Sequence, residues 1–232
     1  MSLDVAVAPG ARPPRRRRFP LLVVVSAAGS LAFVPFLLAQ AAGPASADEL
    51  TGFLVFTSSL AIGASWFGLG WADRLGLPLP LLRAWERGAP LRLERRALLI
   101  SLAAGLAFGA IGLATLSWVG MSGGSGSLAV RAASTGFAAI TLEVILHLGL
   151  MSGMAVLLRG RVRAAIVVTA ALFAAFHLSD AGGQPLDVAL LGAAVNGLGG
   201  LVFGWLYATR GFEYLVLAHA VAHLVTVGVG GG

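Results

Sequence analysis

The chain contains no cysteine and no lysine among its 232 residues. The absence of cysteine excludes disulfide bonds and thiolate metal sites, and it gives no information on the redox compartment. Charged residues make up only 11% of the chain, whereas hydrophobic residues make up 58%. This composition offers too little polar surface for a soluble globule, and the mean hydropathy of +0.90 is typical of a protein with several membrane spans.

Seven apolar runs are candidate membrane-spanning helices, since a span needs about 20 residues. They cover residues 19–43, 51–71, 97–120, 133–158, 164–179, 187–209 and 212–230. The first run follows an arginine cluster, as in a secretory signal peptide, but it exceeds the roughly 7–15 apolar residues of such a peptide. We therefore expect an all-α polytopic membrane bundle of about seven spans, with the first helix retained.

The arginines predict the orientation of this bundle. All sixteen basic residues are arginine, and positive charge gathers on the cytoplasmic side of membrane proteins. Only Arg131 falls on the side opposite to the other fifteen when the seven runs are counted as spans. The distribution predicts a cytoplasmic N-terminus.

The runs and the segments between them predict three parts of the chain. These are a basic cytoplasmic tail at 1–18, a three-span scaffold at 19–120 with a cytoplasmic loop at 72–96, and a four-span core at 133–230. In the loop, Trp85, Leu91 and Leu93 lie among arginines, which predicts an amphipathic stretch at the membrane interface.

Ionisable side chains inside the apolar runs are the strongest functional signal. Three runs hold all four histidines and a glutamate, as Glu143-Val-Ile-Leu-His147, Phe173-Ala-Ala-Phe-His177 and His219-Ala-Val-Ala-His223. A charge at the centre of a span costs at least ~2.5–3.5 kcal/mol, so such groups are usually functional. A lone membrane histidine is more often a helix contact, but five groups at compatible depths favour one site in the outer half of the bilayer.

Glutamate and histidine together predict a narrow range of chemistry. Glutamate can act as a general base toward water, and histidine can orient water, carry a proton or stabilise an oxyanion. These roles fit hydrolysis of an amide bond inside the membrane. A zinc site is the alternative, with nitrogen and oxygen ligands from Glu143, His147, His219 and His223.

In order and spacing, these residues resemble the motifs of the CPBP family, the CAAX-protease and bacteriocin-processing intramembrane endopeptidases. The family's first motif, Glu-Glu-Ile-Leu-Phe-Arg-Gly-Leu, is similar to residues 143–150, Glu-Val-Ile-Leu-His-Leu-Gly-Leu. Its second motif, Phe-x-x-x-His, matches Phe173 and His177. Its third, His-x-x-x-Asn or Asp, matches His219 with His223 in the last place. The resemblance extends over about residues 133–228.

The resemblance implies an enzyme, a glutamate-dependent peptidase that cleaves a membrane-anchored or lipidated protein near its C-terminus. It assigns water activation to Glu143 with His177, and oxyanion stabilisation to His219 with His223. It favours chemistry without a cofactor. The expected auxiliary residues are His147 and Phe173.

The resemblance and the positions of the arginines together predict partners and a location. The partners are a protein substrate and the lipid bilayer, with no nucleic acid, and the location is the bacterial inner membrane. Sortase-like members of the family, which trim the C-terminal anchors of exported proteins, fit a site in the outer half of the bilayer.

Two positions depart from the family. Val144 replaces the second glutamate and Leu148 replaces the arginine. These positions are four residues apart and can pair as ions, so the loss of both leaves no orphan charge. The double change indicates a coherent divergent subgroup, in which His147 and His223 supply the missing polar contacts.

An alternative alignment moves Glu143 to the second acidic position and puts His147 in place of the arginine. Leu142 would then occupy the catalytic position, and the protein would be inactive. We disfavour this alignment because Gly149 and Leu150 fall out of register.

Two other classes of protein are alternatives that fit part of the sequence. A rhomboid-type serine protease would use Ser125 in Gly123-Gly-Ser-Gly, but the match lies in a glycine-serine tract and leaves Glu143 unused. A proton-relay transporter or a scaffold would use the same ionisable cluster. A transporter is less favoured because the sequence has no inverted repeat.

Overall fold

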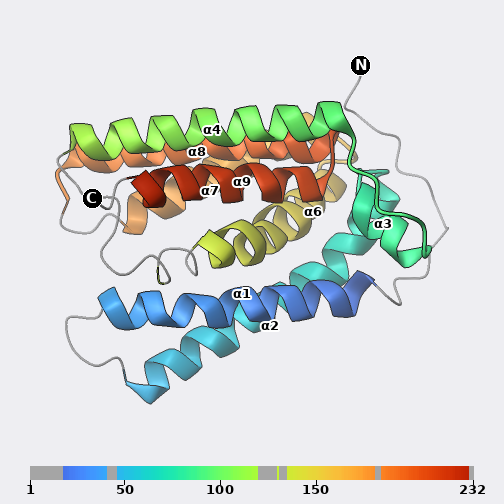
Figure 1. Cartoon of the computed structure of the whole chain (residues 1–232), viewed down its shortest axis with the longest axis horizontal. Helices are drawn as coiled ribbons and strands as arrows, with labels where there is room; N and C mark the ends of the chain where they lie inside the picture. Colours follow the sequence, from blue (N-terminus) through green and yellow to red (C-terminus); the bar gives the residue numbers. More distant parts are fainter. Residues whose placement is uncertain (1–17, 41–45, 120–129, 131–134, 181–183, 230–232) are drawn as a thin grey trace.

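The computed structural model describes residues 18–40, 46–119, 130, 135–180 and 184–229 (Figure 1). The predicted all-α class is confirmed, since no strand occurs among these residues. Two earlier predictions fall outside the described residues. They concern residues 1–17 of the predicted tail and the position of Arg131. The elements are α1 (Arg18–Gln40), α2 (Ala47–Arg74), α3 (Pro80–Glu86), α4 (Arg95–Trp118), η1 (Phe137–Leu142), η2 (Val144–Met151), α6 (Ser152–Leu157), α7 (Val162–Asp180), α8 (Leu186–Thr209) and α9 (Phe212–Val229).

Four of the helices are long and apolar enough to cross a membrane. They are Asp48–Arg74, Arg95–Trp118, Ala139–Leu157 and Leu186–Thr209. The three other predicted spans contain shorter apolar helices, Arg18–Ala32, Val162–Leu178 and Phe212–Thr226. The described residues therefore support an integral membrane protein with four candidate spans, and the count of seven stays a prediction.

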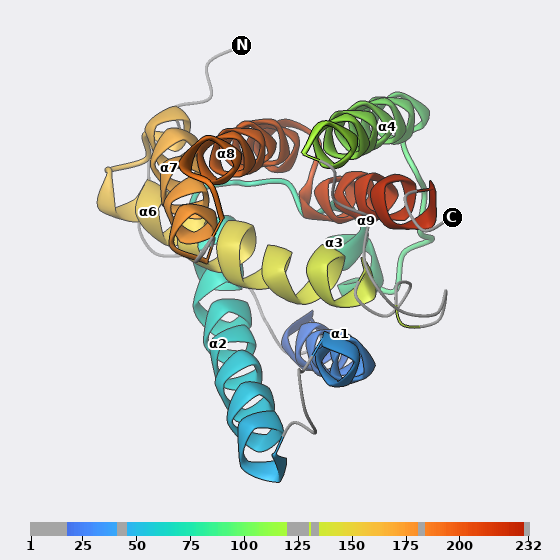
Figure 2. The same cartoon turned by 90° about the vertical axis from the view of Figure 1, so that its left-hand side faces the viewer.

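The helix at residues 137–157, made of η1, Glu143, η2 and α6, lies at the centre of the bundle; we call it the central helix. On one side of it, α7 pairs with α8 and α4 pairs with α9 (Figures 1 and 2). On the other side, α1 packs against η1 and α2 packs against η2. Its apolar stretch is 56% buried, against 28% or less in the other three candidate spans. Of the four candidate spans, the central helix is thus the one that protein surrounds most completely.

The central helix departs from α-helical geometry on both sides of Glu143. Both η1 and η2 are π-helices. The backbone N–H of Ser152 donates to the carbonyl of His147, five residues earlier, as in a π-helix. π-Helical segments are rare and occur frequently at functional sites. The sequence predicts a regular helix here, because no residue type in this stretch signals the wider turn.

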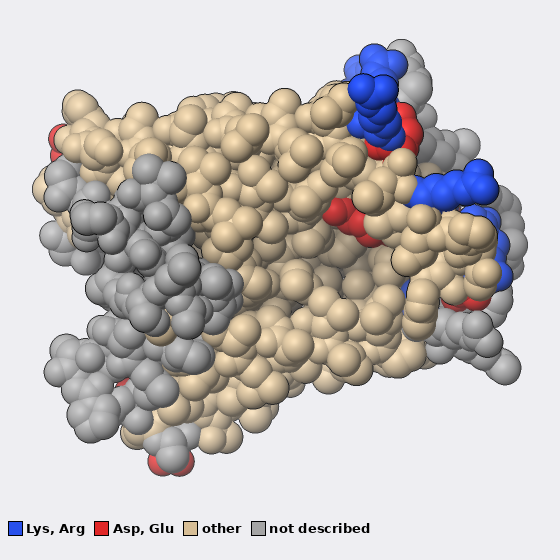
Figure 3. All heavy atoms as spheres, in the orientation of Figure 1, with Lys and Arg blue, Asp and Glu red and all other residues tan. Residues whose placement is uncertain are grey.

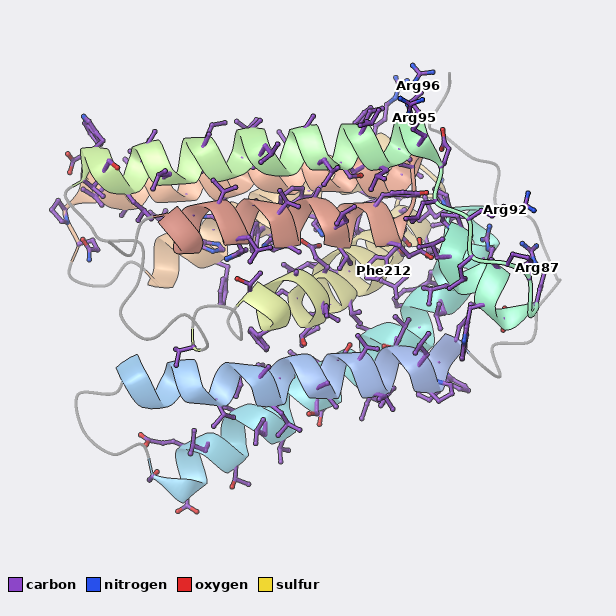
Figure 4. All side chains as sticks on the ribbon, in the orientation of Figure 1. Arg87, Arg92, Arg95, Arg96 and Phe212 are labelled. Atoms are coloured by element: carbon purple, nitrogen blue, oxygen red, sulfur yellow. The ribbon has the colours of Figure 1, made fainter. Side chains whose placement is uncertain are left out.

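Arginine side chains gather at one end of the molecule. Figure 3 shows the basic side chains of the described residues on the visible face gathered at the end that carries α3. Figure 4 labels four of them at this end, Arg87, Arg92, Arg95 and Arg96. Trp85, Leu91 and Leu93 belong to the same segment and are exposed, so apolar and basic groups share this end of the molecule.

A buried ionic cluster holds the same end together. Arg18, at the start of α1, is 1% exposed and donates to both carboxylate oxygens of Asp73 at 3.0 and 2.8 Å. Its Nε atom lies 2.6 Å from Glu86 of α3, and Arg83 lies 3.2 Å from Asp73. A bidentate arginine–carboxylate pair of this kind fixes geometry as well as charge. It joins the start of α1 to the end of α2 and to α3.

α4 and α9 approach one another through glycine. A Cβ atom on Gly105 would lie 2.5 Å from the carbonyl oxygen of Ala218, and one on Gly109 would lie 2.5 Å from Cβ of Val225. Small residues at such positions allow helix backbones to pack closely in membranes. Ala218 directly precedes His219, so α4 determines where this histidine is held.

We predict that Gly105→Ala destabilises the protein by about 1–3 kcal/mol, the usual cost of overpacking, because the backbone oxygen of Ala218 cannot move aside alone. Gly63→Ala in α2 is the matched control, since a Cβ there meets nothing within 4 Å. The control should be neutral or slightly stabilising, because alanine favours a helix over glycine. Denaturant unfolding in detergent micelles measures both, and equal stabilities would contradict the close contact.

Candidate active site

Glu143 lies between two imidazoles in the interior of the bundle. It is 1% exposed, and each carboxylate oxygen is hydrogen-bonded to a different ring, Oε2 to Nδ1 of His147 and Oε1 to Nδ1 of His219. An ionised carboxylate only accepts hydrogen bonds, so both Nδ1 atoms donate. The central helix and α9 are therefore joined by one carboxylate shared between two histidines.

The second ring nitrogens of these histidines have different surroundings. Nε2 of His147 lies 3.5 Å from the carbonyl oxygen of Gly200 on α8, longer than an ordinary hydrogen bond. Nε2 of His219 has no hydrogen-bond partner among the described residues. With Nδ1–H donating to Glu143, this Nε2 carries a lone pair that can accept a proton.

The ring of His219 is in contact with two other rings. Phe203 of α8 stacks on it with centroids 5.1 Å apart and planes inclined by 23°. His223, one turn further along α9, lies 4.8 Å from it at 31°. His223 makes no hydrogen bond among the residues that the structure describes, and so its ring nitrogens are uncommitted.

His177 lies to the side of this cluster. Its Nδ1 donates to the carbonyl of Phe173 at 2.9 Å, and its ring meets the Phe173 ring edge-on at 4.4 Å. It has no hydrogen bond to Glu143 or to another histidine in the described part of the chain. A Cβ on Gly200 would lie 3.7 Å from the Phe173 ring, and the Gly200 carbonyl faces His147. Phe173 thus connects His177 to the cluster.

Of the predicted site residues, the structure brings four together, Glu143, His147, His219 and His223. His177 reaches them only through Phe173, and the catalytic roles of all five stay predictions. The rhomboid-type alternative depends on Ser125, which lies outside the described residues.

The two positions that depart from the CPBP pattern are packed as core residues. Val144 and Leu148 are both fully buried. A Cβ on Gly68 of α2 would lie 2.4 Å from the carbonyl oxygen of Leu148, so α2 lies directly against this turn of the central helix. No charge is left without a partner at either position, as expected when both members of an ion pair are replaced together.

Other contacts that hold the site carry no signal in the sequence. Ser152 of α6 and Tyr207 of α8 share a hydrogen bond of 3.0 Å between their hydroxyls. Thr141 donates to the backbone carbonyl of Ser26 in α1 at 2.9 Å. Phe203 is one apolar residue in an apolar span, so nothing distinguishes it before the fold is known.

The four residues of the alternative zinc site meet in space, but as a hydrogen-bonded network. The Nδ1 atoms of His147 and His219 turn toward separate oxygens of Glu143 rather than toward a common point. Within the described residues, no group of three or more histidine, cysteine, aspartate or glutamate side chains is arranged to hold a metal ion. With Nδ1–H committed to Glu143, the Nε2 atom of His219 is the group that can exchange a proton with water.

The family comparison matches this part of the molecule. Residues 124–225 match the model of a family described as type II CAAX prenyl endopeptidase Rce1-like. This part of the chain is similar to the Rce1-like family. The match confirms the predicted resemblance to CPBP proteases, and it includes all five ionisable residues of the predicted site. No curated protein and no solved structure matches the chain.

The family that these residues resemble is, by its description, one of CAAX prenyl endopeptidases. The matched residues extend from before η1 to α9. They exclude α4, which packs on α9, and α1 and α2, which pack on the central helix.

We predict that His147→Phe costs about 1–3 kcal/mol of folding stability, because one buried oxygen of Glu143 loses its hydrogen-bond partner. His177→Phe is the matched control, since its Nδ1 donates only to a carbonyl of its own helix. Unfolding by denaturant in micelles compares the two. A larger loss for His177→Phe would contradict the assignment of His147 as a partner of the buried carboxylate.

Proposed function

We propose that the chain is an intramembrane endopeptidase that hydrolyses a peptide bond near the C-terminus of a membrane-anchored or lipidated protein. The observation that carries the proposal is the buried carboxylate of Glu143, paired with two imidazoles inside the Rce1-like part of the chain. An ionisable cluster at such a position is expensive, so its presence argues for a chemical role.

In the proposed mechanism, Glu143 and His219 act as one acid–base unit. Glu143 holds the imidazole of His219 with its hydrogen on Nδ1, and the free Nε2 accepts a proton as water attacks the carbonyl carbon. The tetrahedral intermediate then collapses, the carbon–nitrogen bond breaks, and the leaving amine takes the proton from Nε2. This scheme gives His219 a part in water activation, in place of the oxyanion role that the family resemblance implies.

Stabilisation of the oxyanion falls to the remaining histidines. His223 has uncommitted ring nitrogens and touches His219, so an N–H of its ring is suited to donate to the developing negative charge. His177 approaches the same site from α7, by way of Phe173. His147 holds the second oxygen of Glu143 and keeps the carboxylate oriented.

The topology that we propose is seven spans with a cytoplasmic N-terminus. It is supported by the gathering of arginines at one end of the bundle (Figure 3). The location that follows is the bacterial inner membrane, with the site in the outer half of the bilayer. Substrates would then be exported proteins with a C-terminal anchor, as for the sortase-like members of the family.

Activity can be tested with purified protein in proteoliposomes and a quenched fluorescent peptide that ends in a prenylated Cys-a-a-X sequence. We expect Glu143→Gln, His219→Ala and His177→Ala each to lower kcat on the order of 10⁴-fold. Variants that combine these substitutions should have a kcat only slightly lower, because groups that act as a unit give non-additive losses. Glu213→Gln is the control, because the amide oxygen can still accept from the Leu82 backbone N–H, as Glu213 does at 2.7 Å.

Near-normal cleavage by Glu143→Gln would refute the mechanism. Losses that multiply across the three positions would indicate separate structural roles instead. A wild-type protein that cleaves neither this peptide nor a protein with a C-terminal membrane anchor, yet changes the proton flux of the liposomes, would favour the proton-relay alternative.

Metal content tests the proposal that the site works without a cofactor. Elemental analysis of the purified wild-type protein should give a background level of zinc, roughly below 0.1 equivalents per chain. Chelators should leave the rate of cleavage unchanged. Stoichiometric zinc that disappears in His219→Ala would replace the acid–base unit with a metal centre of Glu143, His147, His219 and His223.

A further inference from the structure

A column of rings runs from α4 through α8 to the site. Phe108 of α4 lies 5.4 Å from Phe203 of α8, and Phe203 stacks on His219 at 5.1 Å. His219 in turn contacts His223 at 4.8 Å. The column therefore ends on the two histidines of α9.

The hydrogen bond to Glu143 fixes only one edge of the His219 ring. Rotation about the last side-chain torsion of histidine is broad, so a single hydrogen bond leaves the ring free to tilt about that bond. A flat neighbour on the ring face removes this freedom, and aromatic rings favour such offset stacking. Phe203 occupies this place, with its plane only 23° from that of the imidazole.

We infer that Phe203 is a positioning residue, which holds the His219 imidazole so that Nδ1 meets Glu143 while Nε2 faces the reacting water. This inference deepens the proposed function and rests on it. In this role Phe203 acts through His219.

Phe203 is itself held in place by a helix outside the Rce1-like match. Phe108 touches Phe203, and it also lies 3.1 Å from the position that a Cβ would take on Gly199. α4 is fixed against α9 by the glycine contacts at Gly105 and Gly109. The orientation of the imidazole therefore depends on α4, α8 and α9 together.

Phe212 provides a matched control for loss of packing alone. It lies at the start of α9, labelled in Figure 4, and belongs to the same hydrophobic core. Phe203 is 5% exposed and Phe212 is 3% exposed, so a leucine at either position removes a similarly buried ring. Phe212 contacts Tyr207 and no histidine.

The first experiment measures cleavage by the full-length chain in proteoliposomes, with rates corrected for the folded fraction. Phe203→Leu should lower kcat roughly 10- to 100-fold with little change in KM, as expected when a catalytic group is slightly misplaced. Phe203→Tyr, which keeps the ring, should recover most of the loss. Phe212→Leu should leave kcat within about three-fold of wild type. Equal losses of kcat in the two leucine variants would overturn the inference.

The second experiment needs no catalytic activity. The chain has only four histidines, so ¹⁵N-histidine labelling gives a spectrum that single substitutions can assign. Wild-type His219 should show one Nδ1–H tautomer. Phe203→Leu should give averaged ring nitrogen shifts, whereas Phe203→Tyr and Phe212→Leu should keep the wild-type pattern.

The two experiments separate the inference from the proposed function. Unchanged His219 nitrogen shifts in a folded Phe203→Leu variant would overturn the positioning role, whatever the protein cleaves. The wild-type protein could also lack peptidase activity while the His219 nitrogen shifts of Phe203→Leu change as expected. That result would support the positioning role of Phe203 and refute only the proposed function.

Discussion

The carboxylate of Glu143 is the constraint on which the rest of the structure depends. Moving such an ion out of water costs several kcal/mol even after the protein relaxes, and one partner rarely offsets that cost. Here two imidazoles from different helices engage both oxygens. Because the partners sit on the central helix and on α9, these two helices must approach closely. The need to pair the Glu143 carboxylate with both imidazoles therefore determines both the geometry of the site and the packing of these two helices.

The helices outside the Rce1-like match satisfy this requirement. Glycines of α4 let it lie directly on α9, and Gly68 lets α2 lie directly on the central helix. Thr141 attaches the same helix to α1 through a buried hydrogen bond. At the basic end, Arg18 and Asp73 fix α1 relative to α2. The helices of the predicted scaffold thus act as supports that hold the central helix and α9 at the distance a shared carboxylate needs.

The parts of the fold and site that could be predicted from the sequence are those in which a residue type alone is informative. A glutamate and four histidines inside apolar runs predict a cluster, and four of the five meet. The π-helical turns around Glu143, the stack on Phe203 and the separation of His177 depend on how helices rotate and cross. Apolar runs do not encode these quantities, because any face of such a helix can be buried. Run length likewise predicts more spans than the four that the described helices support.

The divergence from the family pattern follows the same physical logic. With Val144 and Leu148 in the core, the only acidic group of the central helix is Glu143. His147 occupies the position four residues after it and pairs with it, on the same face of the helix. An imidazole is neutral in one of its protonation states, so this pairing carries a smaller desolvation cost than an arginine would. The site thereby concentrates its negative charge on a single carboxylate, which both histidines orient.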